Sequence, residues 1–393
     1  MDASDLLNGK ACISGIGQSA VGRRLGRTGL DLTLESSIAA IEDAGLSRDD
    51  IDGLCSYPGG EGPMAGASTP QVQDALRLSV EWYTGAGEGA GQLNAVFLAV
   101  MAVATGQCRH VLVYRTVTEG SAQGSGRREG IGVNMSGGLP DYFNYLIPYG
   151  AASAVNWCAL YADRHMYEYG TTREQLAQIA LNARRNAGLN PKGIYREPLT
   201  MDDYFAARMI SSPLCLYDCD IPCDGSTAVV VSNAAYAKDA PRLAPRVETF
   251  GTALYGRPRW EQWEDLTTMV MHDSAAQMWT RTDLEPSDVD IAELYDGFSI
   301  LTLLWIEALQ FVGRGEAGPF LEGGRRIALE GELPINTHGG QLSAGRLHGY
   351  SYLHEAIVQL RGDGGDRQVV KALDVAAVAA GGGNTCGCLL LTR

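Results

Sequence analysis

Two segments of the sequence repeat the same order of features, and this repeat constrains the fold more than any other pattern. Residues 13–57 and 247–299 each start with an apolar strand pattern, continue through a glycine-bearing turn that ends in Gly-Arg, and then show a helical pattern. Each segment next has the link Leu-x-x-x-Asp-(Ile/Val)-Asp and a second strand pattern. Hydrophobic periods of roughly 2 and 3.6 residues in this order are typical of a βαβ unit. A chain with two such units is expected to fold as two similar α/β halves.

The correspondence continues beyond the two units. Each unit is followed by a glycine-rich turn, a helix pattern and a strand pattern, at 84–91, 93–106 and 110–116 in the first half and at 339–352, 353–362 and 369–383 in the second. We therefore expect the turns at 84–91 and 345–352 to be related by a pseudo-twofold axis, with two helix N-termini facing one cleft. Glycine permits close approach, and free amide groups at a helix N-terminus suit a thioester or a phosphate.

The repeat is interrupted between its halves. The interruption at 116–214 is rich in glycine and polar residues. Long interruptions of this type form lids or substrate-facing loops, and the alternative here is a solvent-exposed or dimer-contact loop. The predicted organisation is an N-terminal half formed by 1–115 and 215–240, a loop or lid insertion at 116–214, and a C-terminal half at 241–393.

Composition excludes several classes of protein. The formal net charge of −15 argues against nucleic acid or an anionic membrane as a general partner. The N-terminus has no apolar signal core, and no stretch approaches the ~20 apolar residues that span a bilayer, so we expect a cytoplasmic protein. Nine cysteines without a secretion signal make a disulfide framework improbable. Cys215, Cys219 and Cys223 are spaced by four, but prolines break the helix that this spacing would need, so no metal site is predicted.

Five motifs, in order along nearly the whole chain, resemble those of the thiolase superfamily and its lipid-transfer-protein-like branch. They are DLTLESSIAAIEDAGLSRDDIDGL at 31–54, ISSPLCLYDCDIPCDGSTAVVVS at 210–232, ELYDGFS at 293–299, NTHGGQLSAGRLHG at 336–349 and AAVAAGGG at 376–383. The resemblance implies an α/β thiolase-like fold, in which duplicated βαβ halves form a layered α-β-α-β-α core with an inserted loop region.

The motifs of carbon–carbon bond-forming thiolases are all altered. The slot for the nucleophilic cysteine falls near Ala86, and no residue from 84 to 91 is cysteine. The remaining slots read Tyr295-Asp296-Gly297-Phe298 for Asn-Glu-Ala-Phe, Gly345-Arg346-Leu347 followed by His348-Gly349-Tyr350 for Gly-His-Pro, and Ala379 for the second cysteine. Without a thiolate, no acyl-enzyme forms by the usual route. The opening turn is therefore expected to position a thioester through backbone donors.

Two tyrosines are the predicted catalytic residues. Tyr295 and Tyr350 stand in motif slots, and a phenol can donate or accept a proton within hydrogen-bond reach. This inventory fits retro-aldol cleavage of a β-hydroxyacyl-CoA, which needs no covalent intermediate. The sequence looks like the thiolase-like aldolases of steroid side-chain degradation, which implies a 17-hydroxy steroid CoA thioester as substrate and a 17-keto steroid plus propionyl-CoA as products. Tyr352 competes with Tyr350, and the acid and base roles stay unassigned.

Other residues are predicted to support this chemistry. The candidates to orient a tyrosine or polarise the thioester are His348, Asp296 and His338. For both histidines, a purely structural role as a hydrogen-bonded side chain is equally compatible with the sequence. The predicted substrate-positioning turns contain Ala86, Gly87, Gly345, Arg346 and Gly382. Candidate cations for the CoA phosphates are Arg23, Arg24, Arg127, Arg128 and Arg346. No cofactor is expected beyond the CoA of the substrate.

Two other functions remain open on the sequence. One is a non-catalytic thiolase-like carrier of acyl-CoA or lipid, and the other is a condensing acyltransferase with an unconventional nucleophile. The resemblance also implies a homodimer, and a heterotetramer with a small OB-fold partner that often carries a zinc ribbon.

Overall fold

The computed structural model describes the chain except for residues 1–6, 88, 124–142, 152 and 258. Nine strands of the described residues form one mixed sheet in the order β3-β2-β4-β7-β1-β8-β11-β10-β9. They are β1 (Ala11–Gln18), β2 (Gly53–Ser56), β3 (Trp82–Gly85), β4 (His110–Thr118), β7 (Asp224–Asn233), β8 (Arg246–Thr252), β9 (Ile291–Leu294), β10 (Val375–Gly382) and β11 (Thr385–Thr392). A small separate sheet pairs β5 (Met209–Ser211) with β6 (Leu214–Cys215).

The strand order is symmetric about the middle of the large sheet. There β1 pairs antiparallel with β8 through Ala11 with Val247 and Cys12 with Arg246. Outward from this pair, β1-β7-β4-β2 corresponds to β8-β11-β10-β9. In both series the first two pairings are antiparallel and the last is parallel. The duplicated α/β halves expected from the repeat are confirmed.

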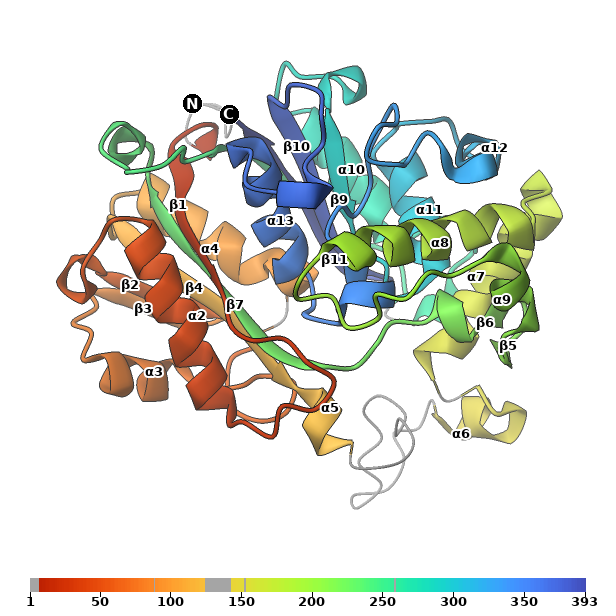
Figure 1. The fold of residues 1–393 in the computed structure, drawn as a ribbon, viewed down its shortest axis with the longest axis horizontal. Coiled ribbons are helices and arrows are strands. Elements are labelled where there is room, and N and C mark those ends of the chain that lie inside the picture. Colours follow the sequence, from red (N-terminus) through yellow and green to blue (C-terminus); the bar gives the residue numbers. More distant parts are fainter. Residues whose placement is uncertain (1–6, 88, 124–142, 152, 258) are drawn as a thin grey trace.

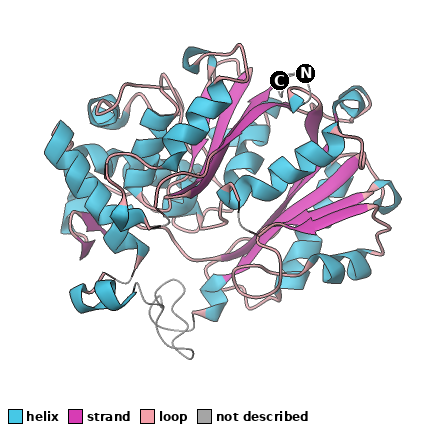
Figure 2. Ribbon diagram, turned by 180° about the vertical axis from the view of Figure 1, so that it is seen from behind, coloured by secondary structure: helices cyan, strands magenta, loops and turns pink. Residues whose placement is uncertain are grey.

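Helices cover both faces of each half and also lie between the halves (Figures 1 and 2). The principal helices of the two halves are α2 (Gly29–Asp43), α3 (Thr69–Leu76), α4 (Asn94–Ala104), α10 (Val270–Trp279), α11 (Ser299–Ala308) and α13 (Tyr350–Arg361). The alternating side chains of β4 show why both faces of the sheet are covered by helices. Leu112 and Tyr114 pack with residues of α2 and α3, whereas Val111 and Val113 belong to the central core with α4. In the second half, α10 packs on β8 and β11, and α13 packs on β9 and β10. The predicted α-β-α-β-α layering is confirmed.

The described part of the segment 116–214 contains several helices. They are α5 (Glu119–Ala122), α6 (Phe143–Leu146), α7 (Ala154–Tyr169), α8 (Arg173–Leu189) and α9 (Met201–Ala206), and α8 packs on α11 and on α12 (Ala317–Leu321) of the second half. Asparagines one turn apart donate from their Nδ2 atoms to backbone carbonyls in the stretch 335–338, at 2.9, 3.1 and 2.9 Å for Asn182, Asn186 and Asn190. This helix therefore fixes the backbone that leads into the loop 339–345.

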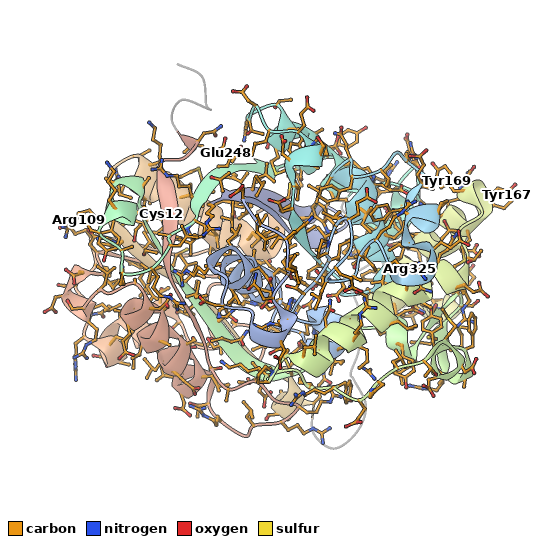
Figure 3. All side chains as sticks on the ribbon, turned by 45° about the horizontal axis from the view of Figure 1, so that its top comes forward. Cys12, Arg109, Tyr167, Tyr169, Glu248 and Arg325 are labelled. Atoms are coloured by element: carbon orange, nitrogen blue, oxygen red, sulfur yellow. The ribbon has the colours of Figure 1, made fainter. Side chains whose placement is uncertain are left out.

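Side chains fill the space between the layers, while Tyr167 on α7 lies at the edge of the molecule (Figure 3). No helix in the described part of the chain is long and apolar enough to cross a membrane. Within the same residues, no cluster of histidine, cysteine or carboxylate side chains has the arrangement of a metal site. All nine cysteines are free thiols.

Candidate active site

Two turns meet where the halves of the protein face each other. Gln92 lies just before α4, and Gly349 lies just before α13. A Cβ on Gly349 would lie 2.8 Å from the Gln92 Cβ and 3.0 Å from the Ala380 Cβ. His348 and Gly349 both have positive φ, 48° and 84°. This turn brings the start of α13 against the segment that precedes α4, so the two helix N-termini lie close together.

Tyr350 is the first residue of α13 and is fully buried. Its hydroxyl has no hydrogen-bond partner among the described residues. Cys55, Arg115, Tyr57 and Tyr114 act electrostatically on it. Burial raises the pKa of this phenol well above its ordinary value, and the charge of Arg115 opposes that rise. A buried hydroxyl without a partner in the described part of the chain is unusual, and a water molecule or a substrate atom could satisfy it.

Tyr295 follows directly after β9 and is 8% exposed. Its ring lies over Gly297, where a Cβ would be 2.7 Å from the ring atom Cε1, so a larger residue would displace the phenol. Burial raises the pKa of Tyr295, and Asp220 adds to this rise. Arg346, Gln341 and Arg115 oppose it. Tyr295 thus shares one charged neighbour, Arg115, with Tyr350.

Arg346 is at the centre of a buried charge cluster. Its guanidinium forms ion pairs with Glu119 and, at 3.3 Å, with Asp220. Burial alone would raise the pKa of Glu119, but His348 and Arg346 outweigh it and lower the pKa to about 2. Burial lowers the pKa of His348 to about 4, so its imidazole is neutral at physiological pH. The His348 Nε2 is 3.6 Å from Glu119, beyond normal hydrogen-bond length.

Asp296 organises the loop 339–345 and engages Tyr352. Its carboxylate accepts from the Gln341 backbone N–H at 2.7 Å and from the Leu342 N–H at 3.4 Å. The Tyr352 hydroxyl also donates to it. Burial raises the pKa of Asp296 to about 6, although Tyr352 and the Gln341 amide oppose that rise. Tyr352, the competitor of Tyr350, is therefore committed to a partner within the chain.

His338 belongs to a neighbouring network beneath the loop. Its Nδ1 lies 3.0 Å from Glu293, which also accepts from the backbone and hydroxyl of Thr337. Burial by itself would lower the pKa of His338, but Glu293 reverses the direction and raises it. The imidazole ring stacks edge-on against Tyr352, with ring centres 5.4 Å apart. His338 thus contacts Tyr352, the hydrogen-bond partner of Asp296.

The glycine-turn residues occupy several different environments. Ala86 is buried at the end of β3; its N–H donates to Ser56 and its carbonyl accepts from Gly59, so its amide is already used. Gly87 is exposed, with open space around a virtual Cβ.

The glycines of the second half are packed more closely. Gly345, with φ of 124°, packs against Ile194 and Cys223. Gly382 lies in β10 against Leu301 and Trp260. Helix α4 starts only at Asn94, several residues beyond Ala86.

A cavity of about 800 Å³ opens beside the buried charge cluster of Arg346. Asp220, Ile221 and Leu342 form its wall next to Arg346 and the loop 339–345, and the insertion contributes much of the remainder. Its cationic lining residues are Arg23, Arg184 and Arg208. Arg127 and Arg128, two of the arginines predicted to meet phosphates, lie outside the described residues.

Sequence reasoning missed Arg115 and Glu119. Arg115 lies in the alternating series along β4, in which Val111 and Val113 face the central core, and Glu119 begins α5 directly after this strand. A charged residue in phase with buried valines is the signal that could have nominated Arg115, because charges are rarely buried without a partner.

Comparison with known proteins places this chain in a family. Residues 255–388 match the family of thiolase C-terminal domain-like proteins. A steroid side-chain-cleaving aldolase of Thermomonospora curvata is 34% identical, over 91% of this chain and 92% of its own length. The 17-hydroxy-3-oxo-4-pregnene-20-carboxyl-CoA lyase of Mycobacterium tuberculosis is 33% identical over 91% of this chain and 93% of its own length. The solved structure of an Ltp2-ChsH2(DUF35) aldolase superposes with a TM-score of 0.87 at 32% identity, covering 99% of both chains.

Fold and motifs together define a thiolase-like enzyme that lacks the thiolase cysteines. The chain belongs to the thiolase superfamily and, within it, to the carbon–carbon lyases represented by these aldolases.

Proposed function

We propose that this protein cleaves a β-hydroxyacyl-CoA by a retro-aldol reaction in which Tyr295 and Tyr350 transfer the protons. The observation that carries the proposal is the pair of buried phenols that share Arg115, one of them with an unpartnered hydroxyl. The cysteine beside Tyr350 is a poor nucleophile. Burial raises the pKa of the Cys55 thiol to about 12, so it stays protonated at physiological pH.

The proposed chemistry balances without a cofactor or a covalent intermediate. One phenol, as phenolate, takes the proton of the substrate's β-hydroxyl. The bond between the hydroxyl-bearing carbon and the α-carbon then breaks; the former becomes a ketone, and the bonding electrons form the thioester enolate. The other phenol protonates the α-carbon, which gives the shortened acyl-CoA. Which tyrosine acts as the base stays open. CoA enters as part of the substrate.

The proposed substrate is a 17-hydroxy steroid whose side chain is a CoA thioester. The names of the two relatives refer to cleavage of a steroid side chain and to a 17-hydroxy steroid CoA thioester. The products would be a 17-keto steroid and propionyl-CoA. Neither tyrosine lines the cavity beside Asp220, but Asp220 acts electrostatically on Tyr295, and a volume of about 800 Å³ falls within the usual size of small-molecule pockets. Arg23, Arg184 and Arg208 give that cavity cations suited to an anionic cofactor segment.

We further propose a homodimer that binds a small OB-fold partner with a zinc ribbon, giving a heterotetramer. The solved Ltp2-ChsH2(DUF35) aldolase, whose name joins two proteins, supports the presence of a partner. The cytoplasm is the proposed compartment, since nine free thiols suit a reducing environment.

Product analysis tests the proposed function. The protein, co-expressed with its OB-fold partner, is incubated with a 17-hydroxy steroid-22-oyl-CoA, and the mixture is analysed by mass spectrometry. We expect a 17-keto steroid and propionyl-CoA in equal amounts, with the intact mass of the protein unchanged. Binding of the thioester without cleavage would instead identify an acyl-CoA carrier. An increase of the protein mass by the acyl group would identify a condensing enzyme with an unconventional nucleophile.

A further inference from the structure

Arg115 is a buried cation that lacks an ion-pair partner in the described part of the chain. It is 3% exposed, and its Nη1 donates to the Tyr57 backbone carbonyl at 2.9 Å. Its Nε has no hydrogen-bond partner among the described residues. Glu119, the carboxylate that acts on it electrostatically, is held by Arg346. Burial lowers the pKa of Arg115 to about 10, so the guanidinium is still charged at neutral pH.

Arg184 is also buried and donates to the Ser343 hydroxyl and the Glu197 carbonyl, without an ion pair in the described part of the chain. Two other buried arginine side chains are compensated by carboxylates. Arg346 pairs with two carboxylates, and Arg361 pairs with Asp43 at 2.6 Å. Removing a charge from water without pairing it costs roughly several kcal/mol of folding free energy. A protein therefore rarely keeps such a charge unless it has a function. The groups that act electrostatically on Arg115 are the phenols of Tyr57, Tyr350 and Tyr295, together with Glu119. Two of these phenols are the proposed proton-transfer groups.

We infer that Arg115 acts through the tyrosine pair as a positioning residue, holding the counter-charge that stabilises the phenolate and the negative charge that then moves to the enolate. The inference rests on the proposed function, because it assigns the cation which that reaction requires. Arg115 suits the role by its place on β4, in the buried alternating series that faces the central core. Its aromatic neighbour Tyr57, with the guanidinium carbon 5.4 Å from the ring centre, fixes the side chain on one face.

The charges around both phenols define what a pH experiment would report. Arg115, Cys55, Tyr57 and Tyr114 act electrostatically on the Tyr350 phenol. Asp220, Arg346, Gln341 and Arg115 act on the Tyr295 phenol. A positive charge lowers the pKa of a nearby phenol, so its removal raises that pKa. A smaller fraction of the phenol is then ionised at neutral pH, and activity moves to higher pH.

The test compares Arg115→Met, which removes the charge, with Arg115→Lys, which keeps it. We expect Arg115→Met to lower kcat/KM about 100-fold at neutral pH and to shift the pH profile upward by about two units, as for one charge a few ångströms away in a protein interior. Arg115→Lys should stay close to the wild-type profile. A purely structural role, through the bond to Tyr57, would lower the melting temperature of both variants and leave both profiles unshifted, which would overturn the inference.

A second readout is independent of turnover. Ionisation of the site phenols is followed by the near-ultraviolet absorbance of tyrosinate during alkaline titration, as the difference between proteins with and without Tyr350→Phe or Tyr295→Phe. We expect Arg115→Met to move at least one of these transitions to higher pH; unchanged transitions would contradict the inference. Arg361→Met is the control, because it removes a buried guanidinium remote in function and should reduce stability without moving either transition. If the wild type cleaves no hydroxyacyl-CoA, the proposed function fails, and the phenol titration still decides the role of Arg115.

Discussion

Replacing Tyr350 by phenylalanine is expected to lower kcat for cleavage at least about 1000-fold while leaving substrate affinity nearly unchanged. A positioned general acid or base contributes roughly 100- to 10,000-fold to a rate, and this phenol is proposed to act only on the reacting atoms. Its hydroxyl has no partner among the described residues, so its removal orphans none of their hydrogen-bonding groups. The free energy of unfolding should therefore change by less than about 1 kcal/mol. Steady-state kinetics and thermal unfolding measure the two effects.

Tyr161→Phe is the matched control for this variant. Tyr161 is also fully buried, but its hydroxyl donates to the Trp260 carbonyl at 2.8 Å. Its loss should reduce stability by about 1 kcal/mol and leave kcat unchanged. If Tyr350→Phe turned over at nearly the wild-type rate, Tyr350 would not be catalytic. Tyr352 would then be the candidate for the second proton-transfer group.

Replacing Gly340 by alanine is expected to disorganise the loop that carries Gln341. The new Cβ would lie 1.9 Å from the Asp296 Oδ2, which anchors this loop, and Gly340 has a φ of 57°. Strain at such a position and the forced displacement of a buried carboxylate together should cost about 3 kcal/mol or more. The shifted loop would also displace Gln341 from Tyr295, so we expect cleavage to fall at least about tenfold. Denaturant unfolding and kinetics on the folded fraction measure both effects.

Gly365→Ala separates backbone strain from the clash. Gly365 has nearly the same φ, 58°, and nothing lies within 4 Å of a virtual Cβ. Alanine there should cost only about 1 kcal/mol and leave activity unchanged. Equal effects at the two glycines would show that the Asp296 contact does not hold the loop.

The sequence predicts the architecture well because the architecture depends on local periodicity. The apolar pattern at 93–106 becomes α4, and the pattern at 110–116 becomes β4. The duplicated order of elements then leaves few arrangements for the sheet. Motif slots also nominate Tyr295 and Tyr350, whose roles stay predictions.

Interactions inside the site join residues that lie far apart in the sequence and share no sequence pattern. Arg346 pairs with Glu119, which is 227 positions away. No periodicity indicates this partner, so the sequence predicts Arg346 only as a turn residue and a phosphate ligand. The commitment of Tyr352 to Asp296 likewise requires the loop 339–345 to fold over that carboxylate. Such pairings are set by tertiary packing.

The most direct test of the central claim is the isotopic composition of the released acyl-CoA. Cleavage of the 17-hydroxy steroid CoA thioester is run in heavy water with the protein and its OB-fold partner, and propionyl-CoA is analysed by mass spectrometry. A retro-aldol reaction through an enolate predicts one deuterium at the α-carbon, delivered by an exchanged phenol. Propionyl-CoA without deuterium, or an acylated protein in place of free product, would contradict the tyrosine-catalysed enolate mechanism.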